Sequence, residues 1–501
     1  LMNRLGSILI LLLAGLLLAF AARRNVPLRN LREQSGITQA DPLINAPPLV
    51  TFTTVALGGF RGMLADFLWL RASRLQQEGQ YFELVQLADW ITTLEPRFTT
   101  VWAYHAWNLA YNISVLFDEP EDRWRWVRHG IRLLRDEGLA YNPGEPRLLY
   151  ELGWLFQHKI GANLDQAHLY YKQAWAAEMA DLFDGPRPDY GALTMAATSR
   201  VDLLSRPGVP ELVAALEQQG RDPFSPARLT ESREAKSDAL LHTAAGQQLT
   251  DYLRLRRLKD DYKMDPAQMR EVDATYGPLD WRLPQAHALF WAWQCRAIAK
   301  DFDALSADRM IFQSLADAFR QGSLFTGLNG DRFIPSPNPD LLPRVRLGFE
   351  DAMRRNPEQD SVRSAYGNFL AESVVMMVSF NRLTEARSLF EELARDFPSG
   401  NTAAGFGPFL LRTFAQRTQE LDDREAQAVV EGALYQALLW QAMGDPARAA
   451  GFDRLARLSW ESYMAPRANS EEWKERTGLP PMDELRAVAR ERVSEAMGGL
   501  R

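Results

Sequence analysis

Histidine supplies much of the acid–base and metal-binding chemistry of proteins, and this chain of 501 residues contains six histidines. All six fall within predicted helices, and none has a partner at metal-ligand spacing. The motifs HExxH, CxxC and GxSxG are absent from the sequence. We therefore expect no metal ion, no cofactor and no catalytic residue, although a site assembled from distant residues would leave no such motif.

Paired carboxylates and cysteine are the next candidates for chemistry. Asp260 and Asp261 are adjacent on a predicted helix, as are Glu391 and Glu392, so the side chains of each pair point in different directions. Such pairs are typical of a soluble helix surface. The single cysteine, Cys295, lies in the apolar and aromatic stretch FWAWQCRAIA, which predicts a buried and inert thiol.

A proline-bounded loop, YGPLDWRLP at residues 276–284, combines an aromatic residue with two charged ones. Its residues Asp280, Trp281 and Arg282 form the least repeat-like cluster of this kind in the chain, which makes them candidates for partner recognition. The alternative is purely structural: the loop caps a helix, and Trp281 is tucked into the core.

The stretch Ala65–Pro96 shows which elements must position such residues. Leu68, Ala72 and Leu75 share one face of a predicted helix, and a second apolar stripe from Tyr81 to Ile91 predicts another helix after it. Gly79 provides the turn between them, and Pro96 ends the second helix. This helical hairpin resembles a tetratricopeptide repeat, whose period is about 34 residues.

Further stretches fit the same repeat pattern. A second unit begins at Trp102 and a third at Leu149. The third unit has apolar or small residues at the repeat spacing, namely Leu149, Leu152, Gly153, Phe156, Ala167, Tyr171 and Ala174. Three later segments match the spacing of the second helix of a repeat: Ile311, Leu315 and Ala318; Val345, Phe349 and Ala352; and Ala386, Phe390 and Leu393. The resemblance implies an all-α, right-handed solenoid of helical hairpins. An irregular helical insert interrupts it.

In tetratricopeptide repeats the first helix of each hairpin lines a concave groove. The resemblance therefore implies that partner-binding positions of the first three units are occupied by aromatic and amide residues, chiefly Trp69, Gln76, Trp107, Tyr111, Tyr150, Trp154 and His158. The basic residues of a carboxylate clamp are missing at such positions. An aromatic groove with few charges suits an extended peptide or a helix of another protein.

The N-terminal region carries a membrane signal. Residues 5–22 form an uncharged run of 18 residues, which as a helix measures roughly 27 Å and can cross a bilayer core. Ala19-Phe20-Ala21 would also suit a signal-peptide cleavage site, but the arginines that follow at 23, 24, 29 and 32 favour a retained anchor. We expect a single-pass protein of a bacterial inner membrane, with the body more readily placed in the periplasm than in the cytoplasm.

Charge composition and the positions of proline-rich and charged segments indicate the expected partners and domain boundaries. A formal net charge of −7 and a pI near 5.6 argue against nucleic acid as a partner. The basic cluster from Arg254 to Lys259 precedes two aspartates and reads as a solvated helix face. We expect an anchor or signal segment at 1–24, a proline-rich linker at 25–56, repeats at 57–179, an irregular helical insert at 180–284, repeats at 285–466 and a charged tail with a capping helix at 467–501.

Three functions follow from these patterns. The leading hypothesis is a non-catalytic scaffold that recruits protein partners, such as transporter or secretion components, to an envelope complex. The second is a module that binds a glycan or a lipid-linked polymer through aromatic stacking, and the third is an enzyme with a site in the 180–284 insert. The chain is also similar to bacterial membrane-anchored proteins that carry an LGGFRG-like entry, ADFLWLRA and a YGPLDWRLP-like loop, a resemblance that implies no particular activity.

Overall fold

The computed structural model describes residues 23, 60–234, 240–325, 334–419, 423–468 and 478–498. The predicted membrane segment at 5–22, the predicted linker at 25–56 and part of the predicted tail lie outside these ranges. Within the described ranges, no helix has both the length and the apolar content that a membrane span requires.

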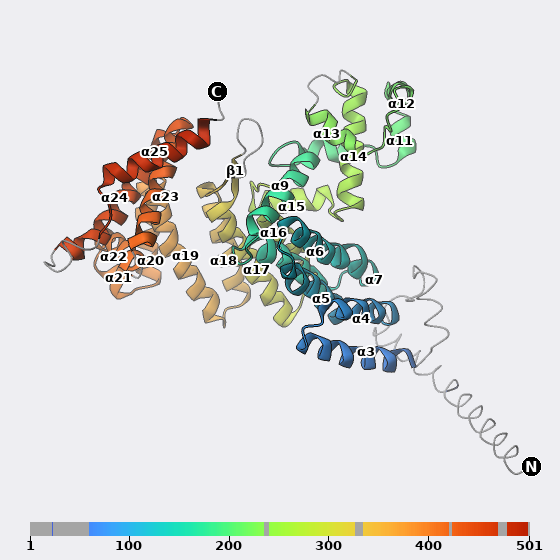
Figure 1. Cartoon of the computed structure of the whole chain (residues 1–501), viewed down its shortest axis with the longest axis horizontal. Coiled ribbons are helices and arrows are strands. Elements are labelled where there is room, and N and C mark those ends of the chain that lie inside the picture. Colours follow the sequence, from blue (N-terminus) through green and yellow to red (C-terminus); the bar gives the residue numbers. More distant parts are fainter. Residues whose placement is uncertain are drawn as a thin grey trace, which may run out of the picture. The chain divides into compact units, whose positions relative to one another are not determined.

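The described residues form an all-α protein, as the sequence predicts (Figure 1). Their one strand pair joins β1 (Ser323–Phe325) to β2 (Ile334–Ser336) in antiparallel register. The described residues divide into two compact units: those up to His105 with Ala140–Pro143 form the first, and Ala106–Leu139 with the described residues from Gly144 onward form the second.

The first unit contains the predicted helical hairpin. Helices α3 (Phe60–Gln77) and α4 (Tyr81–Leu94) pack through Leu68, Leu75, Leu84 and Ile91, which are all buried. Gly79 lies between them at φ +72°, a conformation that a residue with a Cβ adopts only with strain. The predicted helix–turn–helix is therefore confirmed, and its apolar stripes form the core that sequence periodicity indicates.

Three helical runs then change from α to π geometry. Helix α5 (Thr99–Trp107) continues into the π segment η1 (Asn108–Ile113) and the 3-10 turn η2 (Ser114–Leu116). Helix α6 (Pro120–Arg132) continues into η3 (Leu133–Gly138) and α7 (Leu139–Tyr141). Helix α8 (Pro146–Trp154) continues into η4 (Leu155–Gly161). Longer π runs are uncommon in proteins and often accompany functional sites.

The predicted insert is helical throughout most of its described length. After α9 (His168–Phe183) come α10 (Tyr190–Met195), α11 (Arg200–Leu204), α12 (Val209–Gln218), α13 (Ala227–Glu234), α14 (Ala244–Asp260) and α15 (Pro266–Tyr276). Side-chain caps start several of these helices, because Asp189, Ser199, Thr243 and Asp265 each accept a hydrogen bond from a first-turn N–H.

Helix α16 (Pro284–Ile298) lies antiparallel along α8 and η4, although 122 residues separate Gly161 from Pro284 in the numbering. Its first residue, Pro284, approaches Gly161 at the end of η4, while Cys295 Sγ near its other end donates to the Pro146 carbonyl at 3.3 Å. Gly153 allows the close approach: a Cβ there would stand 3.3 Å from the Ala288 carbonyl oxygen of α16. From sequence spacing, the predicted partner of the α8–η4 helix is α9 alone, so its packing against α16 was not predicted.

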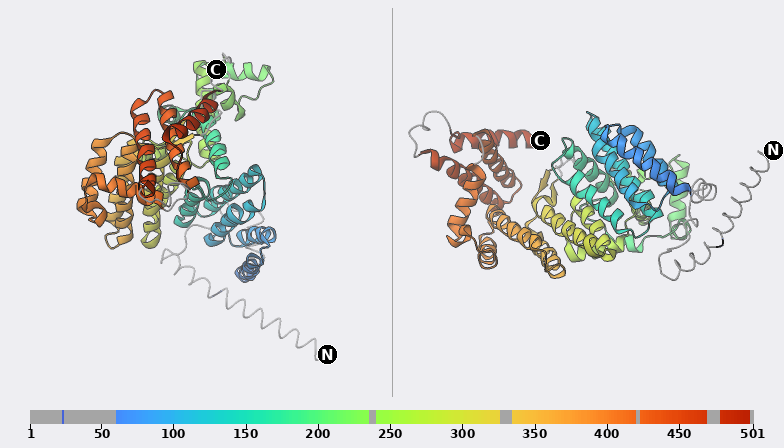
Figure 2. Two further views of the ribbon diagram at one scale, coloured as in Figure 1. Left: turned by 60° about the vertical axis from the view of Figure 1, so that its left-hand side comes forward. Right: turned by 90° about the horizontal axis from the view of Figure 1, so that it is seen from below.

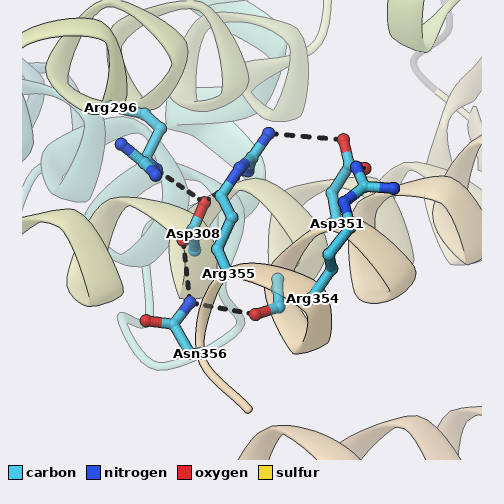
Figure 3. A network of polar contacts seen from close by, with 7 residues as sticks. Arg296, Asp308, Asp351, Arg354, Arg355 and Asn356 are labelled. Carbon is cyan, nitrogen blue, oxygen red and sulfur yellow. Dashed lines mark hydrogen bonds and ion pairs between the residues drawn. The ribbon is translucent and has the colours of Figure 1, made fainter.

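The helices that follow α16 pack in succession: α17 (Asp301–Gln321), α18 (Leu342–Arg355) after the short η5 (Pro339–Leu341), α19 (Asp360–Ser379) and α20 (Leu383–Asp396) (Figure 2). Asp308 of α17 links this helix to α16 and to α18 (Figure 3). Its carboxylate, almost fully buried, accepts hydrogen bonds from Arg296 of α16 at 3.0 Å, from Arg355 of α18 at 2.8 Å and from Asn356 at 2.9 Å.

The C-terminal helices are α21 (Gly400–Ala403), α22 (Phe406–Gln419), α23 (Asp423–Ala442), α24 (Pro446–Ala468) and α25 (Met482–Gly498). The predicted tail helix is thus α25, and it buries Leu485 and Ala489 in the same core as Val430 of α23 and Tyr463 of α24. Gly451 of α24 meets the end of α19, where a Cβ would lie 1.8 Å from the Ser379 carbonyl oxygen.

Candidate binding groove on helices α8, α17 and α19

Five of the predicted site residues form one aromatic row. Trp107 stacks on Tyr111 with ring centroids 5.3 Å apart, and the Tyr111 hydroxyl shares a hydrogen bond of 3.0 Å with His158 Nδ1. His158 stacks on Trp154 at 4.6 Å and 12°, and Trp154 lies 6.3 Å from Tyr150 at 17°. All five side chains are partly or well exposed, so the row borders solvent. We call it the aromatic row.

Two π segments carry the middle of the aromatic row. Tyr111 belongs to η1 and His158 to η4. In a π turn the N–H bonds to the carbonyl five residues earlier, as Ser114 N–H does to Leu109, so the residues that follow are rotated relative to an α-helix. The predicted α-helical spacing places these residues on one side of their helices, but the π turns set the contact between Tyr111 and His158.

A buried ion pair supports the aromatic row from behind. Lys159 Nζ lies 2.5 Å from Asp165 Oδ2 and 5.1 Å from the centroid of the Tyr111 ring. Asp165 also accepts from Arg123 at 3.3 Å and from the Ala167 N–H at 2.8 Å. Burial alone would raise the pKa of Asp165, but the hydrogen bonds from Lys159 and Ala167 hold it below its ordinary value. Asp165 is therefore ionised at neutral pH.

The polar groups within the row are neutral near pH 7. Burial, followed by the charge of Lys159, lowers the pKa of His158 from an ordinary value of 6.5. Burial also raises the pKa of the Tyr111 hydroxyl, and the nearby carboxylate of Glu151 raises it further. The aromatic row therefore presents uncharged rings with hydrogen-bonding edges.

A hollow of about 420 Å³ opens beside Trp154 and His158 of the aromatic row. Trp154, Gln157 and His158 of the α8–η4 helix form one side of it, α17 and α19 form most of the rest, and Phe349 is contributed by α18. Its lining is apolar and aromatic, with amides and three charged groups: Ala162, Phe312, Gln313, Ala316, Asp317, Arg320, Phe349, Ala365, Asn368, Phe369 and Glu372. We call the aromatic row and this hollow together the groove.

The charged groups of the groove share one guanidinium. Arg320 donates to both carboxylate oxygens of Glu372, at 2.8 and 2.7 Å, and to Asp317 Oδ1 at 2.8 Å. The hydrogen bonds and charge of Glu372 raise the pKa of Arg320 despite its burial. Burial raises the pKa of Asp317, and Glu372 adds to that rise while Arg320 opposes it.

The first unit holds the remaining two predicted groove residues. Trp69 packs edge-on against Tyr104 at 5.2 Å and lies 6.0 Å from Phe98, so much of its ring serves the core of that unit. Gln76 is half-buried on the same helix. The exposed apolar surface of α3 is formed instead by Met63, Phe67 and Leu70, which are each more than 60% exposed.

The 276–284 loop serves the packing of the fold. Trp281 is fully buried against His287 and Phe290, which corresponds to the structural alternative that the sequence left open. Asp280 and Arg282 form a two-point ion pair, and both also bond the backbone of Leu324. The Trp281 side chain therefore has no surface to offer a partner, and the two charged groups hold the loop to β1.

The basic cluster of α14 faces its own carboxylates. Arg256 pairs with Asp260 at 2.5 Å and Lys259 pairs with Asp265 at 3.2 Å, and both basic side chains are about half exposed, as predicted. Arg254 and Arg257 are only 13% and 22% exposed, so the prediction of a solvated helix face is met only in part. A second hollow of about 350 Å³ lies beside this helix end, where Arg257 and Tyr262 meet α6 and α9. Its charges are balanced, because the arginines that line it are matched by nearby carboxylates. In the described part of the chain, no cluster of His, Cys, Asp and Glu has the arrangement of a metal site.

Sequence reasoning missed the α17 and α19 side of the groove. Ile311, Leu315 and Ala318 are buried as their spacing predicts, but Asp317 and Arg320 lie on another face of the same helix and line the hollow. A charged face of an amphipathic helix usually borders solvent, so its sequence carries no sign of a groove.

Neither protein-family models nor curated proteins gave a match to this sequence. The function is therefore argued from the groove itself.

Proposed function

We propose that this protein is a membrane-anchored, non-catalytic scaffold whose groove recruits a protein partner to a bacterial envelope complex, such as a transporter or secretion assembly. Its predicted N-terminal membrane helix would hold it at the inner membrane, with the helical body on the periplasmic side. The observation that carries the proposal is that Tyr150, Trp154 and His158 of the aromatic row lie on one continuous helix, α8–η4, which also forms one side of the hollow.

The body is proposed to be a tetratricopeptide-like solenoid in which α8–η4, α17 and α19 are the groove helices. In this proposal α17 is the first helix of its hairpin, whereas the spacing of Ile311, Leu315 and Ala318 predicts a second helix. Helices α16, α18 and α20 would be their partners. Two features support this assignment. Helix α16 packs against both α8 and α17, and the hollow is lined mainly by the three groove helices. On this assignment the segment from α9 to α15 is inserted between the two helices of one hairpin.

The arrangement of the rings favours a protein partner over a glycan. Sugars stack on a free aromatic face, whereas the Trp154 ring already stacks with two other rings, those of Tyr150 and His158. His158 in turn lies between Trp154 and Tyr111. Such a row offers ring edges together with amide and hydroxyl groups, which suit the apolar and backbone groups of a bound peptide or helix. Aromatic residues are also common anchors of protein interfaces.

The proposal is tested by extracting the tagged full-length protein from its own cells in mild detergent and identifying what co-purifies in near-equal amount. A double variant, Trp107→Ala with Trp154→Ala, should lose that partner while keeping its helical circular dichroism. Trp90→Ala is a matched control, because Trp90 is 51% exposed on α4 and lies outside the groove. A partner retained by the double variant, or the lack of any stoichiometric partner, would refute the scaffold.

A further inference from the structure

We propose that helix α3 lies on the surface of the lipid bilayer and inserts its exposed apolar side chains into it. Met63, Phe67 and Leu70, which we call the apolar stripe, then give the first unit an attachment to the membrane besides the predicted N-terminal anchor. The inference rests on the membrane anchoring in the proposed function. It does not depend on the groove, whose residues belong to the second unit.

The outer face of α3 is apolar over its first turns. The residues of the apolar stripe recur at spacings of four and three, so they lie along one side of the helix, and their exposed fractions are 68%, 63% and 71%. The side of α3 that carries Leu68 and Leu75 packs on α4 instead (Figure 1). Single apolar side chains on a surface are ordinary, whereas a row of them on one helix indicates an interaction site.

The position of α3 in the chain favours the bilayer as the surface that covers the stripe. It is the first helix described after the predicted membrane segment, and residues 23–59 lie between the two. A chain of that length reaches at most roughly 130 Å when fully extended. Binding of α3 to the bilayer is therefore an intramolecular step that needs little intrinsic affinity. A second copy or a separate protein partner has no such advantage.

The residue types of the apolar stripe suit the boundary between lipid headgroups and acyl chains. Helices that lie in this boundary bury Phe and Leu on one face, to a depth of about 5–10 Å. A methionine side chain adds flexibility, so it adapts to a surface that has no fixed shape. A fluid bilayer accepts such side chains without the matching pockets that a protein partner would have to provide.

The charges beside the stripe include both signs, so the contact is an apolar one. Arg71 lies 3.9 Å from Glu83 of α4, and Asp66 and Arg74 are both exposed on α3 itself. Attraction to anionic headgroups requires an excess of basic residues on the polar face of a helix. We therefore expect α3 to bind zwitterionic lipid, and to stay bound when the salt concentration is raised.

The test places a spin label on the apolar stripe of the full-length protein in nanodiscs of phosphatidylcholine. Cys295 is buried, so the label attaches to a cysteine introduced by Phe67→Cys. Gln86→Cys is the matched control, because Gln86 is exposed on α4 outside the stripe. Collisions of the label with oxygen, which concentrates in lipid, are compared with its collisions with a nickel chelate, which stays in water. The ratio of the two collision rates should be several-fold higher at position 67 than at position 86.

A second variant keeps the test independent of the label. Leu70→Glu, added to the labelled Phe67→Cys protein, should lower the ratio at position 67 to the value at position 86, because a carboxylate opposes insertion into lipid. Leu70 is 71% exposed, so this change leaves the core of the hairpin intact. A high ratio that is lost with Leu70→Glu supports the inference.

Two results would overturn the inference. Equal ratios at positions 67 and 86 place the stripe in water, and a label at 67 that is shielded from both reagents shows that protein covers it. Carbonate extraction of the native membranes separates these results from a failure of the proposed function. Protein that stays in the membrane fraction keeps the anchor, whatever position 67 reports, whereas protein released into the supernatant would refute the anchor and the inference together.

Discussion

The ion pair behind the aromatic row allows a sharp test of how the groove is held in place. Replacing Asp165 by alanine removes the carboxylate that Lys159 and Arg123 share. The side chains of these two cations are 3% and 12% exposed, so water cannot readily take the place of Asp165. The variant leaves two buried positive charges without their partner.

The structure sets both limits of the expected cost. Breaking a buried ion pair by deleting one member typically costs about 3–5 kcal/mol. Lys159 can also escape by losing its proton, which from an ordinary pKa of 10.5 to pH 7 costs about 5 kcal/mol at most. We therefore expect Asp165→Ala to destabilise the region around η4 by about 3–5 kcal/mol.

Hydrogen exchange followed by mass spectrometry on the full-length protein in detergent measures this locally. The slowest amides of residues 155–161 should exchange faster by about two to three and a half orders of magnitude, because each factor of ten corresponds to about 1.4 kcal/mol. Asp122→Ala is the matched control, since Asp122 also pairs with an arginine, Arg125, but both side chains are exposed. Its effect should stay below about 1 kcal/mol.

The pH dependence of the stability difference between wild type and Asp165→Ala gives a second test. Because the folded pKa of Asp165 is lowered, its contribution is present above the unfolded carboxyl pKa of about 3.8 and is lost as the pH falls through the folded value. The gap between wild type and Asp165→Ala should therefore be constant from pH 7 to pH 5 and shrink below pH 4. An Asp165→Ala variant that exchanges like the Asp122→Ala control would refute the argument.

Three further predictions concern the fold around the groove. Burial lowers the pKa of His287 to about 4, so between pH 6.5 and pH 4 the unfolded state binds more protons than the folded state, and stability falls as the pH is lowered. The melting temperature of His287→Gln should therefore depend less on pH than that of the wild type over this window. Asp308→Asn should lower the free energy of unfolding by about 2 kcal/mol, less than the loss of a fully buried ion pair, because Arg296 and Arg355 are partly exposed. Hydrogen exchange should become faster in α16–α18 but stay unchanged in α23–α25. Gly451→Ala should lower the melting temperature by several degrees, since its Cβ would clash with the Ser379 carbonyl oxygen. Gly432→Ala is the control: a Cβ at this position meets no atom within 4 Å, so this variant should melt at or slightly above the wild-type temperature.

Local periodicity accounts for much of the helical structure that could be predicted. The stripe of Leu68, Ala72 and Leu75 is buried as expected, and Gly79 takes the positive φ of the predicted turn. Part of the aromatic row can also be predicted from the sequence, because Tyr150, Trp154 and His158 follow one another at a spacing of four residues. Such patterns are readable because residues three or four apart on a helix share a face whatever the rest of the chain does.

The roles of the loop residues were open in the sequence for a physical reason. An aromatic residue between prolines can either project into solvent or fill the core, and composition is the same in both cases. Trp281 fills the core because His287 and Phe290 of α16 surround it. Asp280 and Arg282 pair because the backbone of Leu324, more than 40 residues away, completes their hydrogen bonds.

The sequence by itself determined the all-α class, the first hairpin and the faces that its helices bury, because each depends on contacts within a few turns of one chain segment. Tertiary structure alone decided that α16 lies along α8 and η4, and that Asp317 and Arg320 meet Trp154 in one hollow. Those contacts join segments more than 100 residues apart, and the free energy that selects them comes from the packing of surfaces that no local pattern encodes.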